Sequence, residues 1–296
     1  MNSDTTAWTD PVAYLRQALA QDQFTLYCQP IAALSGVVVY PMAEVLVRLR
    51  EEETAMLPPG DFLPVLEHYG MMPELDRWVV REVLRRLSHG PEIARFCINL
   101  SRQTIADNEF PDFFAHEIHA SHVPADRVVF EIDEGDAAAL PSSGRRLCAA
   151  VGSLGAGVLI DGFGRGQSQF ARGQSQLASL GLPCVQFIKL DGSLTRNLAT
   201  DEAAVARILA LLRLTDDLGI TAIAECVEDE EVLARLRAMK VRYAQGFGVC
   251  APQSIDLVRE LPAMRFSARA SNESNNLVPV QGLLDLNTLQ EARWPN

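Results

Sequence analysis

Residues 24–49, FTLYCQPIAALSGVVVYPMAEVLVRL, contain two strand-like segments separated by a short break. FTLYCQPI (24–31) and VVVYPMAEVLVRL (37–49) are rich in apolar and β-branched residues, which favour β-strands. Only AALSG (32–36) lies between them, which is too short for the crossover that parallel neighbours require. The two segments are therefore predicted to pair as an antiparallel hairpin.

Further short apolar segments downstream are also predicted to be strands. They are RFCINL (95–100), RVVFEIDE (127–134), GVLIDGF (157–163), CVQFIKLD (184–191), ITAIAEC (220–226) and RYAQGF (242–247). Most are too apolar to be half-exposed, and continuous apolar strands are typical of a sheet that is covered on both faces.

The segments between these strands carry apolar residues at helical spacing. The repeats are Leu75, Val79, Val83 and Leu87, and then Val205, Ile208, Leu209 and Leu212. The second helix is predicted to begin with Thr200 as its N-cap and to stop at Gly219. Strand–helix alternation repeated about eight times predicts an α/β fold, an irregular (β/α)8 TIM-like barrel with an antiparallel first strand pair. An open doubly wound sheet is the alternative.

The barrel domain is predicted to occupy residues 1–255, with residues 1–22 as an N-terminal helix or lead-in. The region that follows, 256–296, includes FSARASNESNNLVPVQG, which is polar and lacks periodicity. Such a segment has too little apolar surface to pack, so a flexible C-terminal tail is expected.

Composition excludes several classes of protein. The 296-residue chain has 26 Lys and Arg against 38 Asp and Glu, a formal net charge of −12, which disfavours binding to long nucleic acids. A local pocket can still hold a small anion. The six cysteines are scattered and are predicted to be free thiols of a reducing compartment. No apolar segment approaches the roughly 20 residues of a membrane span, and MNSDTTAWTDP is no signal peptide, so we expect a cytoplasmic protein without membrane association.

Polar or charged residues stand at the carboxyl ends of the predicted strands, from the second strand to the eighth. They are Glu44, Asn99, Glu131, Asp161, Lys189, Glu225 and Gln245. A single polar residue at a strand exit would simply meet water. A whole series of them converges on one rim in a barrel, where active sites are found.

The carboxylates in this series indicate a metal site. Carboxylates that crowd together repel and take up protons unless a cation holds them. Oxygen ligands suit Mg²⁺ or Mn²⁺ rather than zinc. Two such ions a few ångströms apart are a common apparatus for cleaving a phosphodiester.

The motifs in this sequence, read in order, resemble one known family. They are Gln29-Pro30-Ile31, Glu44-Val45-Leu46 followed by Arg48, Asn99-Leu100-Ser101, Phe130-Glu131-Ile132-Asp133-Glu134, Lys189-Leu190-Asp191, Ala224-Glu225-Cys226-Val227-Glu228 and Gln245-Gly246-Phe247. From about residue 12 to 255 the chain resembles the EAL domain of bacterial cyclic-di-GMP phosphodiesterases, whose hallmark Glu-Ala-Leu appears as Glu44-Val45-Leu46. The resemblance implies an irregular barrel with an antiparallel first pair and hydrolysis of cyclic-di-GMP to linear pGpG with Mg²⁺ or Mn²⁺.

The resemblance also implies roles for individual residues. The implied metal ligands are Glu44, Asn99, Glu131 and Asp161, with Glu225 as a further metal or water contact. The implied catalytic group comprises Lys189 near the attacking water, Glu225, Gln245 in the wall of the site, and Glu134, which steadies the loop after the fifth strand. The implied ligand contacts are Gln29, Arg48, Glu44, Asp191 and Glu228, with Arg48 suited to a phosphate.

The loop after residue 160 departs from the family pattern. The family has Asp-Asp-Phe-Gly-Thr-Gly where this chain has Asp161-Gly162-Phe163-Gly164-Arg165-Gly166. In the resemblance the second Asp binds the second metal ion, and glycine has no ligand atom. One metal site is therefore expected, and the loss puts the second in question.

A seven-residue repeat follows at once. RGQSQFA (165–171) and RGQSQLA (172–178) differ at one position only, Phe170 against Leu177. Replication slippage in a tolerant loop would explain the copy without any function. Together with Gly162, it also agrees with relaxed constraint on catalysis, because catalysis needs accurate placement of groups.

Three hypotheses about function stay open at this point. The first is a degenerate domain that binds cyclic-di-GMP and signals through a protein partner. The second is an active phosphodiesterase, and the third is an interaction module that no longer binds nucleotide. A homodimer is also expected from the resemblance.

Overall fold

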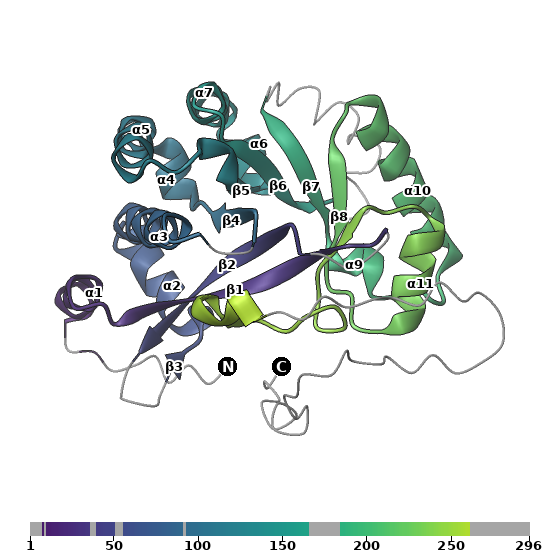
Figure 1. The fold of residues 1–296 in the computed structure, drawn as a ribbon, viewed down its shortest axis with the longest axis horizontal. Helices are drawn as coiled ribbons and strands as arrows, with labels where there is room; N and C mark the ends of the chain where they lie inside the picture. The colour runs from purple at the N-terminus through teal and green to yellow at the C-terminus, as the bar shows by residue number, and fades with distance from the viewer. Residues whose placement is uncertain are drawn as a thin grey trace.

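A computed structural model describes residues 8, 10–35, 40–50, 56–90, 93–165 and 184–260. The described strands form one closed sheet with helices packed outside it (Figure 1). The strands are β1 Phe24–Ala33, β2 Met42–Arg50, β3 Met56–Leu57, β4 Arg95–Asn99, β5 Val128–Asp133, β6 Gly157–Phe163, β7 Val185–Leu190, β8 Thr221–Ala224, β9 Tyr243–Ala244 and β10 Gln253–Ser254.

The first two strands form the predicted antiparallel hairpin. β1 and β2 pair from Phe24 with Leu49 to Ile31 with Met42. β2 is then parallel to β4, and the parallel order continues through β5, β6, β7, β8 and β9. The circle closes where β1 pairs with β9, also antiparallel. The irregular α/β barrel is confirmed, and the open doubly wound sheet is excluded because β1 has a neighbour on each side.

Helices surround the barrel, with α3, α5 and α7 on one side and α10 and α11 on the other (Figure 1). The α-helices are α1 Pro11–Ala20, α2 Pro59–His68, α3 Met72–Leu87, α4 Arg102–Ala106, α5 Phe110–Ser121, α6 Glu134–Ala139, α7 Pro141–Ser153, α9 Gly192–Thr195, α10 Glu202–Asp217 and α11 Glu230–Ala238. Short 3-10 helices cover Ala125–Arg127 and Ile255–Glu260. None of the helices in the described part is long and apolar enough to cross a membrane.

The helix predictions are confirmed in position and wrong in two details. All four predicted core residues of α3 are buried. On α10, Leu209 is 38% exposed, so only part of the predicted face is buried. The N-cap of α10 is Asp201 rather than Thr200, because the Asp201 carboxylate accepts from the Ala203 N–H at 2.8 Å. Gly219 ends the helix with a φ of 69°, a left-handed conformation that favours glycine.

Some strand boundaries also differ from the sequence-based ones. β2 begins at Met42 rather than at residue 37, and residues 36–39 lie outside the described part. β3 and β10 are two-residue strands, too short to give a sequence pattern. β10 pairs with β1, and Asp256 just after it forms an ion pair with Arg86 of α3 at 3.2 Å. The division of the chain at residue 255 stays a prediction, since residues 261–296 lie outside the described part.

Candidate active site at the carboxyl ends of the strands

Inside the barrel, a polar layer lies directly above an apolar layer. The apolar layer comprises Ile31, Met42, Cys97, Val129, Leu159, Phe187 and Ile223, with Tyr243 packed against it. Side chains two positions apart on a strand share a face, so the residue two positions further toward the carboxyl end points into the same interior. These residues are Glu44, Asn99, Glu131, Asp161, Lys189, Glu225 and Gln245, with Gln29 as the equivalent on antiparallel β1. The strand-end residues predicted from the sequence therefore lie at one end of the barrel.

The Lys189 ammonium on β7 lies between carboxylates from two other strands. Its Nζ donates to Glu44 Oε2 on β2 at 2.7 Å and to Glu131 Oε1 on β5. Lys189 is 1% exposed, and burial opposes its charged form, but Glu131 and Glu44 outweigh burial and raise its pKa well above the usual value. The ammonium is the internal counter-ion of this acidic cluster.

Glu44 is the residue on which the cluster converges. Its Oε1 accepts from Asn99 Nδ2 at 2.9 Å, and its Oε2 accepts from Gln245 Nε2 at 2.6 Å as well as from Lys189. Gln245 Nε2 also donates to Gln29 Oε1 at 3.0 Å. Burial alone would raise the pKa of Glu44, but the Lys189 charge and these hydrogen bonds lower it. Glu44 is therefore ionised and accepts hydrogen bonds from residues of β4 and β7 and from Gln245, which directly follows β9.

Two buried carboxylate oxygens in the cluster have no hydrogen-bond partner among the residues that the structure describes. They are Glu131 Oε2 and Asp161 Oδ1, on the adjacent strands β5 and β6. Burial, and then repulsion from Glu44, raises the pKa of Glu131 well above its usual value, and burial also raises the pKa of Asp161. An all-oxygen donor set with two unpartnered carboxylate oxygens fits a hard divalent cation such as Mg²⁺ or Mn²⁺.

The carboxylates are not grouped around a common centre. Among the described residues, no set of three or more His, Cys, Asp or Glu side chains is arranged to hold a metal ion. The Lys189 ammonium pairs with Glu44 and with Glu131. These pairs use Glu44 Oε2 and Glu131 Oε1, so Glu131 Oε2 and Asp161 Oδ1 stay available to a cation.

Glu225 follows β8 and lies beside the start of α9. Its Oε1 accepts from the Gly192 N–H at 2.9 Å, and Asp191, the N-cap of α9, accepts from the Ser193 N–H at 2.9 Å. Burial, followed by the nearby charge of Asp161, raises the pKa of Glu225 to about 7. A carboxyl group with such a pKa can both accept and donate a proton at neutral pH.

In the loop after β6, the side chain of Arg165 lies beside Gly162, the position at which the family pattern has an acid. Arg165 Nε donates to Asp191 Oδ2 at 2.9 Å, and its Nη1 donates to Asp133 Oδ2 at 3.3 Å. A Cβ atom at Gly162 would lie 2.5 Å from Arg165 Nη2. Glu134 is buried against the same loop, where its Oε2 accepts from the Gly164 N–H at 3.4 Å. The rest of the first repeat copy and the whole second copy, residues 166–178, lie outside the described residues.

The two remaining predicted ligand contacts lie further out. Arg48 lies on the same face of β2 as Glu44 and is four residues closer to the carboxyl end of the strand. Its guanidinium lies 5.6 Å from the ring centroid of Tyr27. Glu228 is exposed in the segment between β8 and α11, and no described contact joins it to the Glu44 cluster.

Sequence reasoning missed a buried acid that positions the Asn99 loop. Asp76 on α3 is 4% exposed, and its Oδ2 accepts from the Ser101 N–H and Oγ at 3.0 and 2.7 Å and from Thr104 Oγ1 at 2.6 Å. Ser101 follows Asn99 by two residues and caps α4. The available signal was an acid on the otherwise apolar face of the predicted helix, beside Leu75 and Val79.

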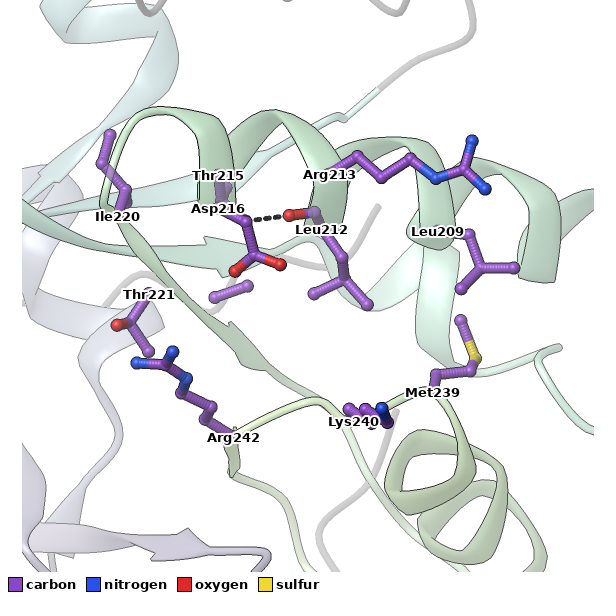
Figure 2. A pocket seen from close by; sticks show the side chains of 11 residues that line it. Leu209, Leu212, Arg213, Thr215, Asp216, Ile220, Thr221, Met239, Lys240 and Arg242 are labelled. Carbon is purple, nitrogen blue, oxygen red and sulfur yellow. Dashed lines mark hydrogen bonds between the residues drawn. The ribbon is translucent and has the colours of Figure 1, made fainter.

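A pocket of about 190 Å³ lies at the opposite end of the barrel (Figure 2). Its walls come from the end of α10, the start of β8 and the turn after α11, and they include Leu212, Asp216, Thr221 and Arg242. None of the predicted site residues lines it. The pocket is therefore separate from the polar layer.

The EAL domain model matches residues 12–252, which is most of the chain. The chain belongs to the EAL domain family. It is 28% identical over 258 residues to the cyclic di-GMP phosphodiesterase PdeF of Escherichia coli, an alignment that covers 86% of this chain and 33% of PdeF. The chain thus spans about a third of the length of that curated relative.

Solved EAL structures share the fold. The FimX EAL domain of Pseudomonas aeruginosa bound to c-di-GMP superposes with a TM-score of 0.74 at 27% identity, covering 82% of this chain and 96% of FimX. The PaMucR phosphodiesterase in complex with c-di-GMP gives a TM-score of 0.73 at 25% identity, with 84% and 99% coverage. The resemblance drawn from the sequence motifs is confirmed at the level of family and fold.

Proposed function

We propose that this EAL domain binds cyclic di-GMP at the polar end of the barrel and that its metal-dependent hydrolysis to pGpG is weak or lost. Binding is supported by membership of a family in which FimX and PaMucR are described with c-di-GMP bound. The observation that carries the loss of hydrolysis is the Arg165 guanidinium, whose Nη2 lies 2.5 Å from the place of a Cβ atom at position 162. A cation held by Asp133 and Asp191 at this place opposes binding of a second metal ion there.

The remaining residues support one divalent ion at most. Glu44, Asn99, Glu131 and Asp161 would hold it, and when bound it would polarise a phosphate oxygen and acidify a water molecule. Lys189 keeps Glu44 ionised and oriented, and Glu225 can exchange a proton near neutral pH. Gln29 and Gln245 fix the Glu44 carboxylate from the side of β1.

A second candidate function is an active EAL phosphodiesterase. It is favoured by the unpartnered oxygens of Glu131 and Asp161 beside an otherwise complete set of strand-end residues. A nucleotide-independent interaction module is the third candidate and becomes the conclusion if no ligand binds. Under each of these we expect a cytoplasmic protein, in keeping with six free thiols, that acts through a second copy or an unidentified protein partner.

Calorimetric titration with cyclic di-GMP in Ca²⁺, combined with measurement of pGpG in Mg²⁺ and in Mn²⁺, tests the proposal. We expect binding with little or no product. Product that disappears in Glu44→Ala would establish the active enzyme instead. No heat and no product under any condition would contradict both. Arg213→Ala, an exposed substitution at the opposite pocket, is the matched control.

Variants of the β6 loop test the stated cause of the defect. Deleting residues 165–171 alone leaves Arg172 after Gly164, so an arginine still follows. The informative variant is therefore Gly162→Asp combined with Arg165→Thr, compared with Gly162→Asp alone. Gain of pGpG formation in the double variant only supports the cause. A double variant that binds the nucleotide and makes no product contradicts it.

A further inference from the structure

Arg165 joins the carboxyl ends of three neighbouring strands. It follows β6 by two residues and pairs with Asp133 at the end of β5 and with Asp191 just after β7. Its side chain is nevertheless 60% exposed. The described contacts engage one N–H of Nε and one of Nη1, so the guanidinium is oriented by carboxylates and still accessible.

The backbone beneath the guanidinium is shaped to receive it. Gly162 has a φ of 66°, and a Cβ there would meet Arg165 Nη2 at 2.5 Å and Cζ at 3.0 Å. A side chain at position 162 would require the guanidinium to shift. Gly162 and Arg165 are therefore complementary, and the group facing this part of the rim is a cation.

An accessible cation attracts a phosphodiester to this end of the barrel, where Arg48 on β2 is the other candidate phosphate contact. The surrounding residues include the carboxyl groups of Glu44, Glu131, Asp161 and Glu225, and each of them that is ionised repels an anion. Lys189 cannot supply the attraction, because it is 1% exposed and pairs with two carboxylates. A planar guanidinium with accessible N–H groups matches the geometry of phosphate oxygens.

We infer that Arg165 is a phosphate-contact residue, held in place by Asp133 and Asp191, that lets this site bind an anionic phosphodiester without a metal ion. The inference rests on the proposed binding of cyclic di-GMP and goes beyond it, since it assigns the contact to a residue that the family pattern lacks. A purely structural role, in which Arg165 only closes the loop onto β5 and β7, is the competing explanation.

Calorimetry with cyclic di-GMP in EDTA distinguishes these roles. Arg165→Ala is expected to weaken binding by about 10- to 100-fold, the range for lost hydrogen bonds to a charged group. Arg165→Lys should lose less, because it keeps the charge, and Arg213→Ala should bind as the wild type does. The logarithm of Kd should also depend less steeply on salt concentration in Arg165→Ala than in the wild type.

Asp133→Asn separates phosphate contact from loop closure. Asparagine can still cap α6 through its Oδ1, as Asp133 does toward Gly135, but it no longer forms the ion pair through Oδ2. Because Asp191 still holds Arg165 Nε, a phosphate contact predicts that this variant loses much less affinity for cyclic di-GMP than Arg165→Ala does. A closure role predicts that it weakens as much as Arg165→Ala. Equal affinity of the wild type and Arg165→Ala overturns the inference and leaves the proposed function standing. Absence of binding by the wild type overturns both.

Discussion

Replacing Lys189 by methionine removes the internal counter-ion and leaves its carboxylate partners in place. Methionine has a similar length and no charge, so it fills much of the buried space of the lysine side chain. Glu131 would then be a 1% exposed side chain beside Glu44 without a cation between them. Lys189→Met therefore tests whether the ammonium holds this end of the barrel together.

The expected loss of unfolding free energy is about 3 kcal/mol at pH 7.5, the lower end of the range for breaking a buried ion pair. The lower end applies because Glu131, whose pKa burial already raises, can take up a proton and relieve part of the repulsion. Removing the ammonium takes away the main cause that lowers the folded-state pKa of Glu44, and it raises that of Glu131 further above the unfolded value. A folded-state pKa above the unfolded one means that stability falls as pH rises, so the loss at pH 5 should be smaller.

Urea unfolding at the two pH values measures the effect, with Lys240→Met as a control at an exposed lysine of the opposite end. The control should change stability by less than about 0.5 kcal/mol. Lys189→Met combined with Glu131→Gln should recover part of the loss, because the second carboxylate charge is gone. A loss below about 1 kcal/mol, or one that does not shrink between pH 7.5 and pH 5, would refute the counter-ion role.

Three further predictions use other parts of the site. Glu225→Gln should stabilise the fold by up to about 3 kcal/mol above pH 7 and by little below pH 4.5, because the raised pKa of about 7 makes the ionised form of Glu225 unfavourable in the folded state. Urea midpoints measured from pH 4.5 to 8 check this. A gain in stability that does not vary with pH would contradict it. Asp76→Ala should lower the free energy of unfolding by about 3 kcal/mol, since three hydrogen bonds from Ser101 and Thr104 lose their acceptor. Thermal unfolding measures the loss, with the exposed Glu231→Ala as the control. A loss no larger than that of the control would contradict the prediction. Asp201→Ala should lower the free energy of unfolding by about 1 kcal/mol, because α10 loses its N-cap, whereas Thr200→Ala should be nearly neutral. Urea unfolding measures both variants. Equal losses would indicate that Thr200 also caps the helix.

The fold and most of the site could be predicted because both follow from the two-residue period of a strand. Apolar residues such as Val129 and Leu159 point into the barrel interior. Glu131 and Asp161 follow them by two positions on the same strands, so their side chains lie on the same face. The hairpin followed from the shortness of the connection after β1. These signals are local, so they can be read from the sequence.

What could not be predicted depends on distances across the barrel. The sequence placed Lys189 near Glu44 and Glu131, but it could not show that the ammonium pairs with both carboxylates. Arg165 was noticed only as the first residue of a repeat, because its partners Asp133 and Asp191 lie 32 and 26 positions away. The N-cap at Asp201 was missed by one residue, since Thr200 is also a good capping residue.

The fit between Gly162 and Arg165 has a consequence for how this chain can change over generations. A lone return of aspartate at position 162 would bring the new carboxylate beside a guanidinium. The two would neutralise each other as an ion pair, and the regained acid would not be available to a metal ion. An aspartate at position 162 would therefore be useful for metal binding only in a chain that has already lost Arg165. The change from Gly162 to aspartate alone would bring no gain in cleavage, so selection for cleavage would not favour it.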